Sequence, residues 1–212
     1  MKKIIVLIIV AIIIIGGGIW IFKESSNNVN QQSNNYETRS LADCNYLGDS
    51  WELLEKEEIS LKFCYKKEWG NAEVQEMTGP NRTGSMFRIG FSSENYPIIN
   101  YSTPDYRNLS AGDIPKQAID WDALDFNKDA LELARLLPFG IENAVAKKLN
   151  VNGKNVLKTN RDYPDHLSGE RFTPVDYFMP NVKINGSGYN LHIMSMLEQE
   201  SDTDTLVKSL TF

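Results

Sequence analysis

Two histidines are the residues of this 212-residue chain that are best suited to acid–base chemistry. His166 lies beside Asp165 and close to Ser168, and these are the three residue types of a catalytic triad. A triad needs its three side chains to converge in space, and neighbours along one loop rarely do so. The spacing therefore favours a polar surface loop. A hydrolase that uses His166 or His192 is the alternative.

A short acidic segment has part of the pattern of a calcium loop. Asp125, Asn127 and Asp129 have the spacing of the first ligands. Such a loop then needs glycine at its sixth position and glutamate at its twelfth, where this chain has Ala130 and Leu136. Carboxylates also complement the dipole at a helix N-terminus, which is the interpretation that we favour. No metal site and no cofactor is predicted.

Cys44 and Cys64 are the only cysteines of the chain. In a cytosolic protein the pattern indicates two unpaired, buried thiols. In an oxidising compartment an even number of cysteines is compatible with a disulfide. A bridge that closes a loop of about 20 residues would stabilise the fold by roughly 3 kcal/mol. The compartment therefore decides between the two interpretations.

Aromatic residues gather around three prolines in the C-terminal third of the chain. Exposed aromatic side chains in loops often form recognition surfaces, whereas buried ones anchor the core. We favour core anchoring for this group, with a recognition surface as the alternative. The candidate recognition surface consists of Tyr163, Phe172, Tyr177 and Phe178.

The N-terminal segment predicts a membrane anchor over residues 1–23. Lys2 and Lys3 precede an uncharged run over residues 4–22, which is about 28 Å long as a helix. A bilayer core is about 30 Å thick, so the run is long enough to span it. No small-residue cleavage site follows, which favours a retained anchor over a cleaved signal peptide. The basic flank places the N-terminus in the cytoplasm and the remainder outside the cell membrane.

The remainder of the chain is predicted to be a linker and one domain. Residues 24–40 are rich in Ser, Asn and Gln and predict a flexible linker, and residues 41–212 have the length of one domain. Three of the 22 basic residues lie in the anchor, so the rest carries 19 basic and 28 acidic residues, a net charge of −9. That charge argues against nucleic acid as a partner, because phosphate binding requires a cationic surface.

Hydrophobic periodicity predicts the elements that position these residues. Apolar residues recur every three or four positions in expected helices over residues 51–58, 127–137 and 201–210, with further helical turns at 141–148. Apolar and polar residues alternate in expected strands over residues 59–66, 73–78 and 87–91, with an edge segment at 96–101.

Two Asn-Gly pairs are the strongest local signals. Asn152-Gly153 and Asn185-Gly186 favour the type I′ turns of antiparallel hairpins. Hairpins that alternate with helices predict an α+β domain in which helices cover one antiparallel sheet.

Three segments resemble the PsbP-like family of extracytoplasmic proteins. Residues 63–70 are similar to the family's early strand ending in Tyr-Pro-x-x-Trp, with Lys66 in place of proline. Residues 151–156 resemble its mid-chain strand turn, and residues 206–212 resemble its terminal helix and Ser-hydrophobic-x-Phe ending. Over residues 45–212 the resemblance implies an α/β/α sandwich. Members are mostly non-catalytic accessory or binding domains.

The sequence thus predicts a single-pass membrane protein that presents an α+β domain outside the cell membrane. Its expected role is that of a non-catalytic binding or accessory module for an envelope or membrane partner. An envelope hydrolase that uses His166 or His192 is the alternative.

Overall fold

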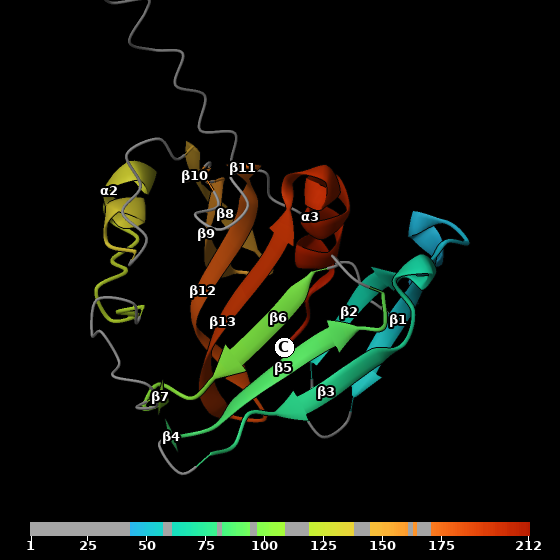
Figure 1. Cartoon of the computed structure of the whole chain (residues 1–212), viewed down its shortest axis with the longest axis horizontal. Coiled ribbons are helices and arrows are strands. Elements are labelled where there is room, and N and C mark those ends of the chain that lie inside the picture. Colours follow the sequence, from blue (N-terminus) through green and yellow to red (C-terminus); the bar gives the residue numbers. More distant parts are fainter. Residues whose placement is uncertain are drawn as a thin grey trace, which may run out of the picture. The chain divides into compact units, whose positions relative to one another are not determined.

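A seven-stranded antiparallel sheet is the centre of the fold (Figure 1). Its strands follow the order β3-β5-β6-β13-β12-β9-β8, and every neighbouring pair is antiparallel. The α+β prediction is confirmed. The strands are β3 (Ala72–Glu76), β5 (Met86–Phe91), β6 (Ile98–Ser102), β8 (Val145–Val151), β9 (Lys154–Asn160), β12 (Pro174–Ile184) and β13 (Ser187–Met196).

The computed structural model describes residues 43–56, 61–79, 82–93, 97–108, 119–137, 145–160, 163–164 and 171–212. The predicted anchor, the predicted linker and His166 lie outside the described residues. Within the described ranges, no helix combines the length and apolar character that a membrane crossing requires. All described residues belong to one compact unit, Asn34–Phe212.

Smaller elements surround the sheet. Two α-helices, α2 (Ala130–Arg135) and α3 (Glu200–Ser209), are described, together with the 3-10 turns η1 (Asn45–Leu47), η2 (Lys67–Trp69) and η4 (Leu197–Gln199). Three two-stranded pairs complete the described elements. These are β1 (Trp51–Lys56) with β2 (Leu61–Lys66), β4 (Arg82–Thr83) with β7 (Arg107–Asn108), and β10 (Tyr163–Pro164) with β11 (Arg171–Phe172).

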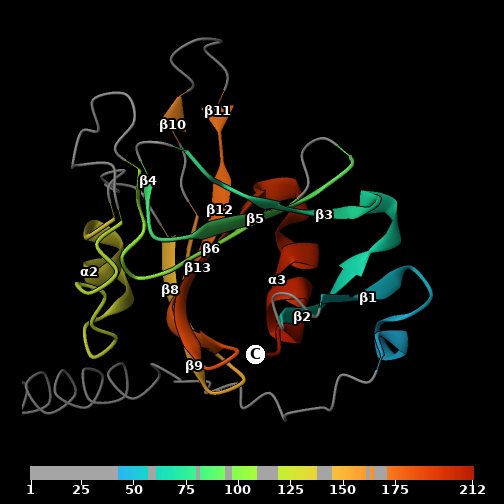
Figure 2. The same ribbon diagram turned by 90° about the horizontal axis from the view of Figure 1, so that it is seen from below.

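The sheet curves around α3, and α2 lies on the opposite side (Figure 2). We call the sheet face that packs on α3 the inner face and the opposite one the outer face. On the inner face, Leu206 and Val207 of α3 belong to the main core with strand residues such as Tyr177. On the outer face, Leu133 of α2 packs in a second core that includes Phe178. Apolar residues therefore alternate between two cores along β12, as the two-residue period of a strand requires.

Both Asn-Gly hairpins form as predicted. Asn152 and Gly153 have φ angles of 48° and 79° between β8 and β9, and Asn185 and Gly186 have 50° and 78° between β12 and β13. Two successive positive φ angles define the type I′ turn, and asparagine and glycine tolerate them best. The predicted hairpin of residues 73–78 and 87–91 also forms, as β3 and β5.

Three other predicted elements are wrong. Residues 51–56 form strand β1 instead of a helix, because they pair along their whole length with β2. Residues 145–148 are the start of strand β8, which pairs with β9 up to the Asn-Gly turn. The predicted edge segment forms β6, an internal strand between β5 and β13. In each case cross-strand pairing outweighs a weak local preference.

Candidate functional site

His192 on β13 forms a polar contact with a buried carboxylate on the outer face. Its Nε2 lies 2.7 Å from Oδ1 of Asp176 on β12. Asp176 is completely buried, whereas His192 keeps 19% of its side-chain surface exposed. A buried carboxylate needs hydrogen-bond donors, so an imidazole hydrogen belongs on Nε2. The pair thus holds the ring so that, among the described residues, Nδ1 is the nitrogen without a partner.

The imidazole is also fixed by stacking. The ring of Phe178, the residue directly opposite on β12, lies 4.7 Å from the His192 ring with an interplanar angle of 8°. Phe178 in turn contacts Trp121 at a centroid distance of 6.2 Å. The stack and the hydrogen bond to Asp176 leave the ring little freedom to rotate. The His192 ring is therefore held in one orientation.

A β-bulge brings Asp176 and His192 to the same face. Continuous pairing from the Asn185-Gly186 turn would align His192 with Met179, and Asp176 would then lie on the opposite face. The register instead shifts between Met179 and Val182, so that His192 pairs with Phe178. Asn181 within the bulge has a φ of 53°. A one-residue shift reverses the faces of all subsequent residues, and this explains why sequence reasoning missed Asp176.

The strand register extends the site into a row of polar side chains. His192 aligns with Asn100 on β6, Asn100 with Arg88 on β5, and Arg88 with Gln75 on β3. Directly opposed residues share a sheet face, so all four lie on the outer face. With neighbouring strands about 4.8 Å apart, the row is about 14 Å long. We call Gln75, Arg88, Asn100 and His192 the polar row.

One internal hydrogen bond orders the polar row. Arg88 Nε donates to Asn100 Oδ1 over 3.1 Å. Arg88, Asn100 and His192 are partly exposed, and Gln75 is exposed. Among the described residues, the terminal nitrogens of Arg88, the amide nitrogen of Asn100 and Nδ1 of His192 have no hydrogen-bond partner. These groups are available to a ligand.

The described residues supply only part of a hydrolytic site. Asp176 and His192 correspond to the orienting acid and the base of a triad. Within the described part of the chain, no serine, threonine or cysteine hydrogen-bonds to His192. The other predicted candidates, His166 and Ser168, lie outside the described residues. The geometry shown here supports hydrogen bonding to a ligand better than nucleophilic attack.

The acidic segment before α2 uses its carboxylates locally. Asp125 accepts hydrogen bonds from the backbone and side chain of Asn127. Asp129 caps α2 by accepting from the Glu132 backbone over 2.8 Å, and Glu132 accepts in return from the Asp129 backbone. The described ranges contain no group of three acidic, histidine or cysteine side chains arranged for a metal ion. This segment is therefore the acidic N-terminus of helix α2.

The predicted recognition residues do not share one surface. Tyr177 is completely buried on the inner face, and Phe178 is buried on the outer face beneath His192. Neither can contribute to an exposed surface, because adjacent strand residues enter the two cores. Tyr163 and Phe172 pair across β10 and β11, and only their backbone is described.

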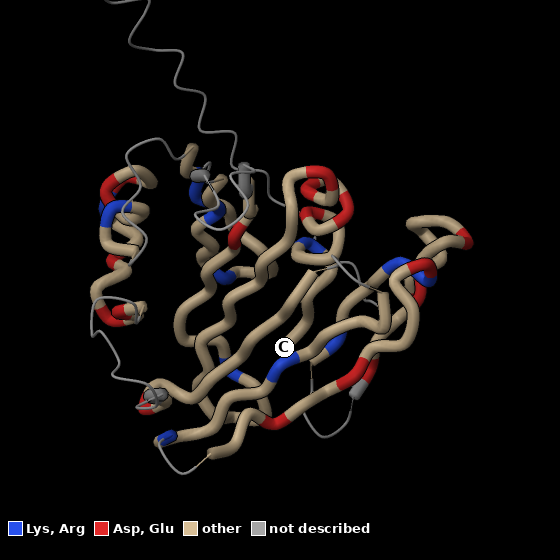
Figure 3. Tube along the Cα trace, in the orientation of Figure 1, with Lys and Arg blue, Asp and Glu red and all other residues tan. Residues whose placement is uncertain are grey.

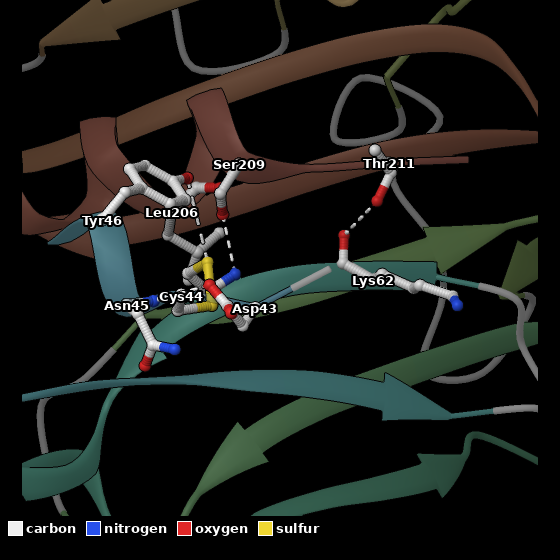
Figure 4. Close-up of a disulfide and its surroundings, with 9 residues drawn as sticks. Asp43, Cys44, Asn45, Tyr46, Lys62, Leu206, Ser209 and Thr211 are labelled. Carbon is white, nitrogen blue, oxygen red and sulfur yellow. Dashed lines mark hydrogen bonds between the residues drawn. A yellow bond between two sulfur atoms is a disulfide. The ribbon is translucent and has the colours of Figure 1, made fainter. Parts of the chain in front are cut away.

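The structure joins Cys44 and Cys64 through a disulfide (Figure 4). Both cysteines are buried. The backbone N–H of Cys64 donates to Ser209 Oγ at the end of α3 over 2.7 Å. Two residues further on, the backbone of Thr211 exchanges hydrogen bonds with Lys62. The disulfide, β2 and the C-terminal segment therefore form one connected unit beside the inner face.

Ion pairs connect α3 to the sheet. Figure 3 marks the acidic positions of α3 in red and the basic positions of the neighbouring strands in blue. Lys158 Nζ on β9 lies 2.6 Å from Glu200 Oε1 and 2.7 Å from Asp204 Oδ1, and only 8% of its side chain is exposed. The Tyr177 hydroxyl donates to the same Asp204 oxygen over 2.8 Å. Burial, and secondarily the charges of Asp204 and Glu200, raise the pKa of Tyr177 above its usual value. This network orients α3 and has a structural role.

Comparison with known proteins does not identify the chain. No protein-family model and no curated protein matches it. One similar solved structure is that of LpqN, a protein involved in cell envelope biogenesis of Mycobacterium tuberculosis. The two chains are 13% identical, the match covers 77% of this chain and 78% of LpqN, and the TM-score is 0.32. PA94, a Pseudomonas aeruginosa protein of unknown function, is similar at 8% identity, covering 76% of this chain and 96% of that chain, with a TM-score of 0.34. Likenesses this distant carry no inference about function.

Proposed function

We propose that the chain is a single-pass membrane protein whose α+β domain acts outside the cell membrane as a non-catalytic binding or accessory module. The observation that carries this proposal is the disulfide between the only two cysteines. Disulfides persist in oxidising compartments and are rare in the cytosol. The apolar run over residues 4–22 supplies the membrane segment, and residues 24–40 supply the linker.

The polar row supports binding as the role of the domain. It presents hydrogen-bonding groups from β5, β6 and β13 on a partly exposed face. The resemblance to PsbP-like proteins points in the same direction, because those proteins are mostly accessory or binding domains. We propose an envelope or membrane protein as the partner, since the predicted anchor keeps the domain close to the membrane.

Thiol labelling in intact cells tests the location of the domain. We expect Cys44 and Cys64 to resist a maleimide reagent, even after denaturation, until a reductant is added. The same denatured sample treated with reductant is the positive control. Labelling of both thiols after denaturation without reductant would contradict the proposed location, because it would show that no disulfide forms in the cell.

Crosslinking in intact membranes tests the binding role. We expect the full-length chain to form a discrete crosslinked complex with one envelope or membrane protein. The variant Arg88→Gln, which alters the polar row, should reduce the yield of this complex severalfold. Arg82→Gln is the matched control, because Arg82 lies on β4 outside the row. A chain that stays monomeric and uncrosslinked would count against a binding module.

The Asp176–His192 pair is the observation that favours an envelope hydrolase as the second candidate. That function requires at least one of the two histidines as a base. The double variant His166→Ala/His192→Ala, expressed in cells that lack the natural protein, separates the candidates. Full rescue of the deletion phenotype by this variant would remove the hydrolase, whereas loss of rescue by a folded variant would support it.

A further inference from the structure

On the basis of the binding role above, we propose that the polar row recognises a carboxylate that lies next to an amide N–H, the chemistry of a peptide C-terminus. Arg88 is the main anchor, and Asn100 and His192 complete the site. The proposal specifies the chemical class of the ligand.

Arg88 is positioned to present its terminal nitrogens. Its Nε is engaged by Asn100 Oδ1 at 3.1 Å, which fixes the plane of the guanidinium group. The two terminal nitrogens are then left as a planar pair. This pair matches the two oxygens of a carboxylate in a bidentate arrangement, which gives geometric specificity as well as attraction.

Among the described residues, Arg88 forms no ion pair. Its direct cross-strand neighbours are Gln75 and Asn100, which are both neutral. Glu73 lies on the same face in the adjacent row, but within the described ranges Arg88 has no ion pair. In a chain with a net charge of −6, such an arginine on a polar sheet face is complementary to an anionic ligand.

Asn100 and His192 add one donor and one acceptor. Oδ1 of Asn100 accepts from Arg88, which leaves its amide nitrogen as a donor, and His192 is the next residue of the row. That nitrogen can donate a second hydrogen bond to the carboxylate. Nε2 of His192 is engaged with Asp176, so in the tautomer that carries its hydrogen on Nε2 the ring accepts through Nδ1. An amide N–H beside the carboxylate is the group that would satisfy this acceptor.

Space for a ligand exists beside Arg88. Gly90 lies two residues further along β5 on the same face. A Cβ atom built on Gly90 would meet no heavy atom within 4 Å. A side chain at this position is therefore tolerated by the fold but would occupy the volume next to the guanidinium group. Gly90→Phe blocks the site without removing any of its hydrogen-bonding groups.

The test is an NMR titration of the isotopically labelled full-length chain in zwitterionic micelles, with N-acetylglycine as the probe. We expect saturable shifts of the Arg88 Nε–H, the Asn100 side-chain amide and the His192 ring. Arg88→Gln and Gly90→Phe should each weaken binding at least about tenfold, which corresponds to about 1.4 kcal/mol. N-acetylglycinamide, which lacks the carboxylate, should not bind, and acetate should bind more weakly than N-acetylglycine.

Arg82→Gln is the control for removal of an arginine, since Arg82 donates to the Thr78 carbonyl away from the row. Unsaturable shifts, equal affinity of Arg88→Gln and wild type, or tighter binding of inorganic phosphate would each overturn the proposal. These results are distinguishable from failure of the binding role. If the chain crosslinks to its partner but does not bind N-acetylglycine, only the carboxylate ligand is ruled out. If Cys44 and Cys64 are labelled without reductant, only the proposed location is overturned.

Discussion

Replacing both Cys44 and Cys64 by alanine is expected to lower the free energy of unfolding by about 3 kcal/mol. The disulfide joins residues 20 positions apart and restricts the conformations of the unfolded chain. Strand β1 lies inside the closed loop, so its pairing with β2 also depends on this restriction. Alanine is preferable to serine here, because both cysteines are buried and a hydroxyl would lack partners.

Urea unfolding of the full-length chain in zwitterionic micelles, followed by tryptophan fluorescence, measures this effect. Trp69 is completely buried in the main core and reports the loss of packing around β2. Wild-type protein unfolded in the presence of reductant should approach the stability of the double variant. Equal transition midpoints for the variant and the oxidised wild type would show that the disulfide does not stabilise the fold.

The variant Lys158→Met is expected to lower the free energy of unfolding by about 2 kcal/mol. Removal of this buried cation leaves Glu200 and Asp204 without their shared partner on the sheet. Breaking a fully buried ion pair costs about 3–5 kcal/mol. The loss should be smaller here, since the two carboxylates keep 31% and 28% of their side-chain surface exposed and can be solvated.

Lys62→Met is the matched control for this prediction. Lys62 forms an ion pair with Glu55 on β1, but both side chains are more than two-fifths exposed, at 42% and 48%. Exposed pairs contribute about 0–1 kcal/mol, so the same substitution should have a small effect at this position. Urea unfolding of both variants gives the comparison. A loss for Lys158→Met no larger than that for Lys62→Met would contradict a stabilising network beneath α3.

Sequence patterns correctly predict those elements whose conformation depends only on residues close together in the chain. Asn152-Gly153 and Asn185-Gly186 correctly predicted two hairpins, because few other residues adopt two successive positive φ angles. The alternation of apolar and polar residues over 61–66 correctly predicted strand β2. A two-residue period is a property of the segment itself and does not depend on distant residues.

The predictions failed where pairing with distant residues outweighed the local pattern. Residues 51–56 have the composition of a short amphipathic helix, yet they form β1. Their backbone hydrogen bonds are made with β2, and Trp51 packs edge-on against Trp69 with a centroid distance of 6.1 Å. The helical signal of such a short segment is weak compared with these contacts.

The candidate site was only partly visible in the sequence. His192 was recognised as a residue type suited to chemistry, but its partner Asp176 was not. The turn at Asn185-Gly186 alone predicts the wrong faces, because the bulge near Asn181 shifts the register by one residue. Arg88 gave no local signal, since its place in the polar row depends on the order of β5, β6 and β13 in the sheet.

The hairpin turns, the number of cysteines and the acidic charge follow from the residues alone, because they are properties of single residues or of close neighbours. Three other features depend on the fold: Cys44 bonds to Cys64, Tyr177 and Phe178 enter separate cores, and Asp176 contacts His192. The face that a strand residue occupies depends on register, and register is set by pairing and packing along the whole sheet.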